Sequence, residues 1–422
     1  MTKSAQRDEN SQGKTILAQL MLPMAAMIRG DVRDLVMSLG IQAIAVMFEQ
    51  ERTELCGPLY VHDAERSATR GGSVPGQLVM GGRKVRVSRP RVVDRNGHRV
   101  PLGTWEELRA ADPMTDRVLE QMTVGVATRK YARSLEPVPE QLEESGTSKS
   151  SVSRRFVEVT EQKLQEWLAR PLGELGIRAV FLDGLHFAEH VVIAALGVDA
   201  AGKKHVLGIW EGATENGPAC RAMLNDLVMR GLDAETTRLF VIDGSGALRA
   251  AIRDVFGKRA LVQRCQVHKI RNVESHLPKK KQAAARAAMR EAYKSTKVET
   301  AKRLLNNLAR TLETAHPSAA GSIREGLDET LTVMALGLPR TLERSFSTTN
   351  PIENLNERIR QISKRVKRWR GGSMILRWTA AGVFEAERGF RRLKGHAQMQ
   401  KLIAAITPRQ SENVVDDHQQ VA

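Results

Sequence analysis

The stretch AVFLDGLHFAEHVVIAALGVDAAGKKHVLGIW, residues 179–210, decides the fold class of this chain. Its apolar runs predict three strands, over residues 179–183, 190–198 and 204–210. The segment Asp199-Ala-Ala-Gly202 separates the last two runs and is typical of a tight turn. We therefore expect the second and third strands to form an antiparallel hairpin.

Helices and strands alternate after this stretch. Residues 218–230 and 246–256 read as helices, and the short apolar runs 238–242 and 260–264 predict a fourth and a fifth strand. Three antiparallel strands, then helix, strand, helix and strand, is the order of the ribonuclease H-like fold. The sequence therefore predicts an α/β, ribonuclease H-like catalytic domain.

Two aspartates occupy matching places in this pattern. Asp183 and Asp243 each end an apolar strand and each precede a glycine. Side chains at the carboxyl ends of such strands face the crevice where ligands bind in open α/β sheets. Two carboxylates on neighbouring strands need a cation between them, and Mg²⁺ or Mn²⁺ with phosphate oxygens suits this donor set. One Asp-Gly pair is an ordinary turn signal, but its repetition in matching strand context favours a divalent-metal site.

A third carboxylate is expected from a later helix. Capping residues followed by Pro351 place Glu353 near the N-terminus of that helix. Glu357 is one turn further along the same face, so spacing alone does not choose between the two. The region 344–401 carries 14 Lys and Arg against 4 Asp and Glu, which suits a polyanionic substrate.

Cys265 and His268 form a Cys-x-x-His pair directly after the fifth strand. Half of a zinc site is one interpretation, although no second pair stands at suitable spacing, and a thiol nucleophile is another. A structural role in the vicinity of the active site is the interpretation that we favour. Neighbouring basic residues, among them Arg264 and Lys269, indicate that phosphates lie close by.

The charge balance of the whole chain indicates the class of partner. The 422 residues include 65 Lys and Arg against 48 Asp and Glu, a net charge of +17, which points to nucleic acid. Three cysteines far apart in sequence exclude a disulfide framework. An aromatic content of 4% argues against a single-strand binder, and the lack of a tyrosine after Tyr293 argues against a tyrosine recombinase. The sequence contains no run of about 18 apolar residues, so no membrane-spanning helix is predicted.

The N-terminal part has a different character. Residues 15–54 have apolar positions at helical spacing and predict two short helices. Between residues 57 and 103 glycines separate short runs, and residues 84–89 alternate basic or polar with apolar side chains. This pattern predicts a basic β-hairpin region whose Arg86 and Arg89 contact a DNA backbone, with a merely solvated strand face as the alternative.

Residues 113–170 predict a helix-turn-helix-like region. Helical stretches over 118–135 and from 141 onward precede a turn at Gly146, and Thr147 or Ser148 can cap a final helix. Many capped basic helices bind nothing, but this one begins with side chains suited to phosphate and base-edge contacts in a major groove, namely Lys149, Arg154 and Arg155.

Five segments together resemble one protein family. They are FLDGLHF (181–187), WEGATEN (210–216), VIDG (241–244), QRCQVHKIRN (263–272) and TNPIENLN (349–356), and they are similar to the Mutator-type transposases of bacterial insertion sequences. The likeness extends over about residues 16–402. It implies that Asp183, Asp243 and Glu353 form a metal-binding Asp, Asp, Glu (DDE) triad. It also implies that Cys265 and His268 are the Cys-x-x-His signature of the family and that a helical insertion precedes Glu353.

The resemblance implies a DNA transposase that uses Mg²⁺ or Mn²⁺ to hydrolyse a phosphodiester at the element's ends and then joins the freed 3′-hydroxyl to another strand. Its partners would be double-stranded DNA, as terminal inverted repeats and as target, and a second copy of the chain in a homodimer or higher oligomer. Its location would be the bacterial cytoplasm, at the nucleoid when bound to DNA, with no membrane association. A nuclease or resolvase that does not join strands, and a domesticated sequence-specific DNA-binding protein, are the alternatives.

These expectations divide the chain into six regions. They are the N-terminal helices and basic β-hairpin (1–112), the helix-turn-helix-like region (113–170), the first part of the ribonuclease H-like core (171–270), the all-helical insertion (271–343), the C-terminal helices of the catalytic core (344–405) and a disordered tail (406–422).

Overall fold

The computed structural model describes residues 32–61, 66–110, 112–136, 142–212, 216–364 and 366–407. Contacts divide the chain into two compact units, residues 1–159 and 160–422, called here the N-terminal and the C-terminal unit. The division falls inside a long helix, α5 (Lys149–Ala169), whereas the sequence placed a boundary after that helix. Within the described ranges, no helix combines the length and apolar character that are needed to cross a bilayer.

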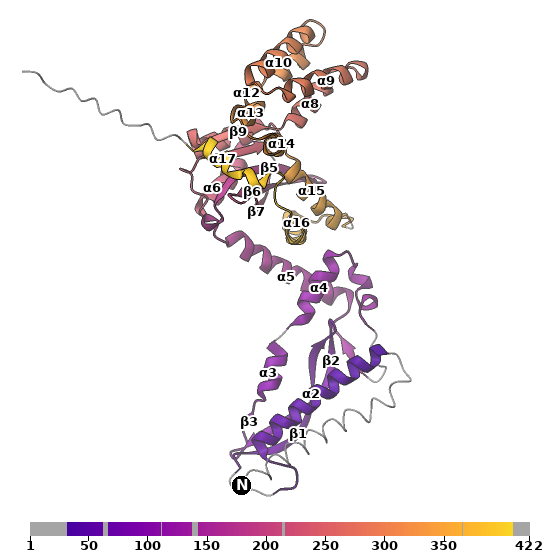
Figure 1. Ribbon diagram of the computed structural model, residues 1–422. Coiled ribbons are helices and arrows are strands. Elements are labelled where there is room, and N and C mark those ends of the chain that lie inside the picture. Colours follow the sequence, from indigo (N-terminus) through magenta and orange to yellow (C-terminus); the bar gives the residue numbers. More distant parts are fainter. Residues whose placement is uncertain are drawn as a thin grey trace, which may run out of the picture. The chain divides into compact units, whose positions relative to one another are not determined.

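The N-terminal unit is built on a β-hairpin, as predicted. Strands β1 (Ala68–Met80) and β2 (Arg83–Asp94) are antiparallel, and Gly81 and Gly82 connect them with positive φ angles of 56° and 83°. Two successive positive φ angles form the tight turn that matches strand twist, and glycine adopts them without strain. The remaining elements are α2 (Val32–Cys56), β3 (Arg99–Val100), α3 (Gly103–Ala110), α4 (Pro113–Thr123) and β4 (Glu144–Ser145), and Figure 1 labels them.

Strand β2 has the two faces that its alternation predicts. Val85, Val87 and Val92 are buried, whereas Arg86 between the first two is exposed. The valines at 87 and 92 join a core with Phe48 of α2 and Trp105 of α3. This burial fixes the register of the hairpin, because a slip by one residue would turn the valines outward.

The helix before the hairpin is longer than predicted. The sequence suggested two short helices over residues 15–54, but α2 is a single helix of 25 residues, Val32–Cys56. Gly40 lies within this helix and does not end it. The part of the prediction that precedes residue 32 lies outside the described residues.

The helix-turn-helix prediction is wrong. Helix α4 ends at Thr123, and Gly125 follows with a φ of 99°, which stops the helix; two short 3₁₀ turns, Thr128–Lys130 and Ala132–Ser134, come next. Residues 144–145, expected in a second helix, form β4 and pair with β2. Only the last helix is as expected: α5 follows Gly146, and Ser148 Oγ accepts a hydrogen bond from Ser151 N at 3.2 Å.

The C-terminal unit contains the α/β arrangement that the sequence predicted. Its five-stranded sheet has the order β7-β6-β5-β8-β9, in which β7, β6 and β5 are antiparallel neighbours and β5, β8 and β9 are parallel. The elements are β5 (Ile177–Phe187), β6 (His190–Asp199), β7 (Lys204–Glu211), α6 (Gly217–Met229), β8 (Arg238–Ile242), α7 (Gly246–Phe256) and β9 (Ala260–Arg264).

Strand β5 corrects one detail of the prediction. It does not end at Asp183 but continues to Phe187, because residues 183–187 still pair with β6. Its parallel pairing with β8, however, stops at Leu182, opposite Ile242. Asp183 is therefore the first residue beyond the parallel pairing, although it lies inside the strand.

Alternate residues of the sheet enter two different cores. Val180 and Leu182 of β5 face the side covered by α6 and α7, and their neighbours Phe181 and Leu185 face the opposite side. That opposite side is covered by later helices, including α14 (Arg340–Phe346), α15 (Asn350–Ser363), α16 (Gly372–Arg388) and α17 (Met399–Ile406). By the same alternation, Asp183 points toward the side that α15 covers.

The region between β9 and α15 is helical throughout its described residues, as the sequence predicted. Its helices form a separate apolar cluster that includes Ile270, Met289 and Leu305, and they gather beside β9 (Figure 1). They are α8 (Gln266–Ser275), α9 (Lys279–Lys294), α10 (Val298–Glu313), α11 (Pro317–Arg324), α12 (Leu327–Thr330) and α13 (Thr332–Ala335). The break expected at Gly371-Gly372 separates α15 from α16, and the expected tail lies outside the described residues from 408 onward.

Two buried cations and an exposed carboxylate join these helices to the sheet. Arg264 at the end of β9 binds Glu325 Oε1 at 2.5 Å, and Lys269 Nζ of α8 binds Glu325 Oε2 at 3.0 Å. Lys269 Nζ also donates to the carbonyl oxygens of Ser322 and Glu325. Partial burial opposes ionisation of Glu325, but the hydrogen bonds from both cations lower its pKa from 4.5 to about 2. Glu325 thus fixes α11 and α12 to the strand that precedes the active site.

Glu325→Gln is expected to destabilise the protein at pH 7 by about 1–2 kcal/mol, because it removes the anion of two buried cations, while solvent at the 57% exposed Glu325 side chain screens both ion pairs. A lowered carboxyl pKa stabilises the folded state above pH 4.5, and this contribution disappears as the pH falls toward about 2. Thermal unfolding of both proteins at pH 7, 5, 4 and 3 measures it, and the difference should shrink below pH 4.5. Glu313→Gln, which breaks an exposed pair with Arg324, is the control and should leave the melting temperature almost unchanged. Equal effects of the two substitutions would contradict the prediction.

Candidate active site

Three neighbouring strands place functional side chains in one row. Leu182 of β5 pairs with Ile242 of β8, and Ile242 pairs with Arg264 of β9. The next residues in the three strands are Asp183, Asp243 and Cys265, so they follow one another across the carboxyl edge of the parallel sheet. Cys265 continues this row, since its N–H donates to the carbonyl oxygen of Ile242 at 2.8 Å. The sheet alone therefore brings Asp183 and Asp243 together, as the sequence predicted.

Helix α15 completes the site from above the sheet. Glu353 lies in its first turn, and Asn356, one turn later, donates from Nδ2 to Asp183 Oδ2 at 2.8 Å. The Asn356 side chain is 1% exposed, so this hydrogen bond is shielded from water. Glu353 is partly buried and contacts Thr349, whereas Glu357 is exposed.

The two strand aspartates are held in a partly buried, electrostatically strained arrangement. Burial and the nearby carboxylate of Asp243 raise the pKa of Asp183 from 3.8 to about 6, while His268 lowers it. Glu353 adds a smaller effect in the raising direction. Asp243 is oriented by its own turn, in which Ser245 N donates to Asp243 Oδ1 at 3.0 Å. Like charges at this spacing in a half-buried site form a suitable place for a cation.

Glycine is required after Asp243. Gly244 has a φ of 123°, and a Cβ atom there would lie 2.8 Å from the guanidinium of Arg264. Arg264 donates to the Gly244 carbonyl oxygen at 2.8 Å. The glycine of this Asp-Gly pair therefore allows the positive φ angle of the backbone and the close contact with Arg264.

Cys265 and His268 are adjacent to the carboxylates. Cys265 is fully buried, and although burial opposes ionisation, hydrogen bonds from His268 and Thr349 lower the pKa of its thiol. The hydrogen bond to Cys265, together with Glu353 and Asp183, raises the pKa of His268 above 6.5 against the effect of burial. His268 Nδ1 lies 3.8 Å from Glu353 Oε1. The pair is thus linked to the site through hydrogen bonds.

Arg264 and Lys269, which were expected in the vicinity of the active site, are held in ion pairs inside the protein. Arg264 and Lys269 are 4% and 3% exposed, and both are bound to Glu325. Glu325 neutralises both charges, because a buried cation is stable only beside an anion. Both residues lie close to the candidate site, and Arg264 contacts it through its hydrogen bond to the Gly244 carbonyl oxygen.

The sequence-predicted DNA contacts of the N-terminal unit separate into two groups. Lys149 and Arg154 are exposed at the start of α5, and Arg86 is exposed on β2 with Glu143 as its partner at 2.6 Å. Arg89 lies 4.7 Å from the centre of the Trp105 ring and Arg155 binds Asp112 and Thr115, so these two side chains support the fold.

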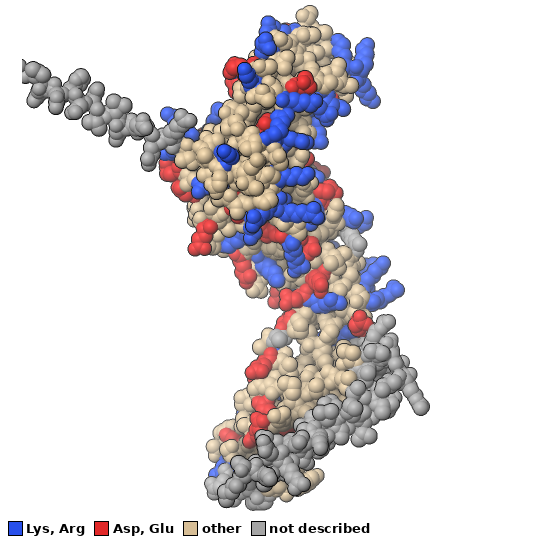
Figure 2. Space-filling view, viewed as in Figure 1, with Lys and Arg blue, Asp and Glu red and all other residues tan. Residues whose placement is uncertain are grey.

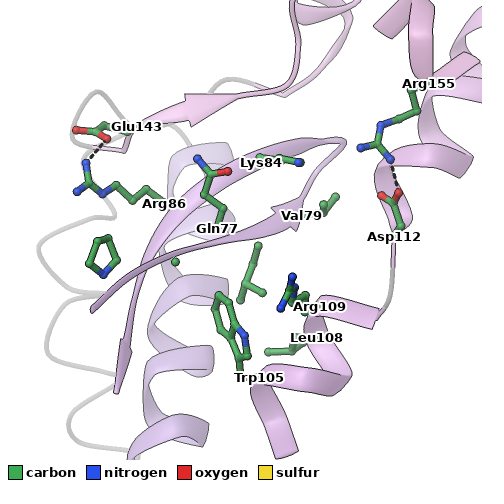
Figure 3. Close-up of a pocket in the computed structure, with 13 residues that line it drawn as sticks. Gln77, Val79, Lys84, Arg86, Trp105, Leu108, Arg109, Asp112, Glu143 and Arg155 are labelled. Atoms are coloured by element: carbon green, nitrogen blue, oxygen red, sulfur yellow. Dashed lines mark hydrogen bonds and ion pairs between the residues drawn. The ribbon is translucent and has the colours of Figure 1, made fainter. Parts of the chain in front are cut away.

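A groove runs along β1 in the N-terminal unit. It encloses about 670 Å³ and is lined by residues of β1, β2 and α3 and by both ion pairs just described. Figure 3 shows Arg86 turned toward Glu143 and Arg155 toward Asp112, with Trp105 and Arg109 on α3. Lys84 and Arg109 add positive charge, so the lining is basic overall.

Positive charge is also concentrated on the C-terminal unit. Figure 2 shows Lys and Arg side chains crowded over the part that carries α9, α10 and α15. On α15 and just after it, exposed cations follow the helix away from Glu353, namely Arg358, Arg360, Lys364, Lys367, Arg368 and Arg370. A polyanion that reaches Glu353 would therefore meet a positive surface.

Sequence reasoning missed two residues of the site. Thr349 was seen as a helix cap, yet its side chain contacts Cys265, His268 and Glu353. Asn356 was quoted without a role, yet it holds Asp183. The available signal for Asn356 was its spacing, three residues after Glu353, which places both on one face of a helix.

Comparisons with known proteins agree on one family. The model of a family described as "Transposase, Mutator family" matches residues 12–391. The transposase for insertion sequence element IS256 in transposon Tn4001 of Staphylococcus aureus is 26% identical over 332 residues, which cover 76% of this chain and 82% of that protein. The transposase for ISRM5 of Rhizobium meliloti is 28% identical over 346 residues, 80% and 84% of the two chains. The transposase for IS406 of Burkholderia multivorans is 28% identical over 288 residues, 65% and 71% of the two chains.

Proposed function

The chain belongs to the Mutator family of transposases, and we propose that this DNA transposase works by metal-dependent phosphoryl transfer at Asp183, Asp243 and Glu353. One observation carries the proposal: the two aspartates follow the last paired residues of neighbouring parallel strands, beneath the helix that presents Glu353. Three carboxylates provide hard oxygen ligands of the kind that Mg²⁺ and Mn²⁺ prefer, so the donor set fits a divalent cation.

The two aspartates are each oriented by a different hydrogen-bond donor. Asp183 and Asp243 would hold the cations and Glu353 would complete the site, while Asn356 Nδ2 and Ser245 N keep the two aspartates in place. Bound divalent cations supply an activated water and neutralise charge on the scissile phosphate. The same carboxylates serve water attack at the element's end and then attack by the freed 3′-hydroxyl on a second strand. No covalent protein–DNA intermediate is required.

We also infer that the catalytic unit is ribonuclease H-like with an all-helical insertion. The sheet order β7-β6-β5-β8-β9, antiparallel in its first part and parallel in its second, supports this assignment. Helices α8–α14 stand between β9 and α15 and would be the insertion. The separate apolar cluster of α8–α13 supports a body that folds beside the sheet, whereas α14 packs on the sheet through Leu342 and Phe346.

The N-terminal unit is proposed to bind the terminal inverted repeats. Exposed Arg86, Lys149 and Arg154 are suited to phosphates or base edges, and the basic groove along β1 supports the same role. Two ends must be paired before joining, so a homodimer or higher oligomer would be the working form, on both inverted-repeat and target DNA.

A strand-transfer assay tests the proposed activity. Labelled DNA that carries the element's inverted repeats is incubated with the protein and an unlabelled target, in Mg²⁺, in Mn²⁺ and with EDTA. Cut and joined products with either metal, and neither with EDTA, are expected. Cutting without joining would assign a nuclease, and binding without cutting would assign a DNA-binding protein only.

Arg154→Ala is expected to weaken binding of inverted-repeat DNA several-fold and to reduce the slope of log K against log[salt] by about 1, since one phosphate contact is lost. Fluorescence anisotropy at several salt concentrations measures both quantities. Lys203→Ala, which removes an exposed charge from the β6–β7 turn, is the control and should leave the slope unchanged. An unchanged slope for Arg154→Ala would exclude Arg154 from the DNA interface.

A further inference from the structure

Thr349 lies at the centre of the hydrogen bonds that surround Glu353. Its side chain is fully buried, and its Oγ1 donates to Glu353 Oε1 at 2.7 Å. The same oxygen is 3.3 Å from Cys265 Sγ and 3.3 Å from His268 Nδ1. The backbone N–H of Thr349 also donates to Cys265 Sγ, at 3.4 Å. One residue therefore connects the end of β9 and the start of α8 to the first turn of α15.

The position of this hydroxyl bears on what Cys265, His268 and Glu353 do. Their ligand atoms lie within 4.8 Å of one another, an arrangement that is typical of a metal site. A zinc ion would need all three atoms at about 2.0–2.3 Å. Thr349 Oγ1, however, already lies within 3.3 Å of each of them and occupies the middle of the group. The three side chains are thus satisfied by a hydroxyl, and the cluster is better explained as a support for Glu353.

The valence of the hydroxyl matches this role. A threonine hydroxyl has one hydrogen to donate and two lone pairs that accept. The shortest contact, to Glu353 Oε1, takes the hydrogen, and a lone pair faces His268 Nδ1, while the Thr349 backbone N–H donates to Cys265 Sγ.

We propose that Thr349 is the positioning residue of the active site, fixing the rotamer of Glu353 through its hydroxyl, with Cys265 and His268 fixing Thr349 in turn. This inference rests on the proposed role of Glu353 as a metal ligand. A residue that orients a ligand without touching the metal typically changes metal affinity by about 10–100-fold when it is removed.

The test compares Thr349→Val, which keeps the shape and removes the hydroxyl, with Thr349→Ser, which keeps the hydroxyl. The dissociation constant for Mn²⁺ is measured on the full chain by counting free Mn²⁺ with electron paramagnetic resonance, and cleavage of end DNA is measured alongside. Thr379→Val is the matched control, because Thr379 is equally buried and its Oγ1 has no hydrogen-bond partner among the described residues. Melting temperatures are recorded for every variant, and Thr349→Ala replaces Thr349→Val if the latter does not fold.

Thr349→Val should raise the Mn²⁺ dissociation constant about tenfold, with Thr349→Ser and Thr379→Val within about twofold of wild type. In a Glu353→Gln background the same substitution should have less than a twofold effect, because the hydroxyl acts through Glu353. Equal losses for Val and Ser, or a tenfold effect that persists without Glu353, would overturn the role of Thr349. If Glu353→Gln binds Mn²⁺ and cleaves DNA as wild type does, the proposed metal site itself fails, whatever Thr349 does.

Discussion

Asp183→Asn is expected to reduce DNA cleavage and joining by about a thousandfold in Mg²⁺. Asp183 interacts electrostatically with both Asp243 and Glu353, and Asn356 Nδ2 donates to its Oδ2 at 2.8 Å. An amide has almost the same shape but lacks the negative charge that a divalent cation requires. Losing about 4 kcal/mol of transition-state stabilisation corresponds to this factor. Single-turnover cleavage of labelled end DNA measures it, and full strand-transfer activity in the variant would refute the assignment.

The same substitution stabilises the metal-free protein. Burial and Asp243 raise the pKa of Asp183 from 3.8 to about 6, so ionising this group at pH 7 opposes folding by about 3 kcal/mol. This penalty is complete above pH 6 and disappears as the pH falls toward 3.8, where the carboxyl is protonated in both states. Asp183→Asn should therefore melt several degrees higher than wild type at pH 7.5 in EDTA and at nearly the same temperature at pH 4. Asp254→Asn, at an exposed ion pair, is the control and should not raise the melting temperature.

Glu353→Gln has the second large effect, a loss of at least about a hundredfold in cleavage rate. Its carboxylate accepts a hydrogen bond from Thr349 Oγ1 and lies 3.8 Å from His268 Nδ1. Glu353 also raises the pKa of Asp183, so the two carboxylates interact electrostatically. Removing its charge takes away the third ligand and leaves the hydrogen bond from Thr349 with a weaker acceptor. Cleavage rates at saturating Mg²⁺ and Mn²⁺ measure the loss.

Glu357→Gln is the matched control for this prediction. Glu357 is on the same helix, one turn later, with the same side chain, but it is exposed to solvent. It should retain cleavage within about twofold of wild type. If Glu357→Gln loses activity and Glu353→Gln keeps it, the third carboxylate has been assigned to the wrong turn of α15.

The sheet could be predicted because its physics is local. Each strand of the C-terminal unit is a short apolar run between turn residues, and parallel strands that end together bring their next residues together. Asp183 and Asp243 could be paired from this rule alone. Even the error in the end of β5 left the pair intact, because Asp183 is still the first residue beyond the pairing with β8.

The failures depended on contacts between distant segments. Residues 144–145 pair with Lys84 and Val85 instead of forming part of a helix. A local sequence pattern cannot predict pairing with a strand about sixty residues earlier in the chain. Arg264 and Lys269 were expected in the vicinity of the active site, where their charge indicated that phosphates lie close by. Both bind Glu325, which lies in the helical region about sixty residues later in the chain. The sequence does not predict how that region packs against β9. The roles of Thr349 and Asn356 were hidden for the same reason, since both depend on how α15 lies over the sheet.

The central claim, that three carboxylates perform metal-dependent cutting and joining, is tested most directly by one comparison. Wild type, Asp243→Ala and Glu353→Ala are incubated with labelled inverted-repeat DNA and a target in Mg²⁺, Mn²⁺ or EDTA, after each variant has been shown to melt as a folded protein and to bind the DNA. The account predicts cut and joined products for wild type with either metal, and none for wild type in EDTA or for either variant. Joined product formed by Asp243→Ala, or by wild type in EDTA, would contradict it.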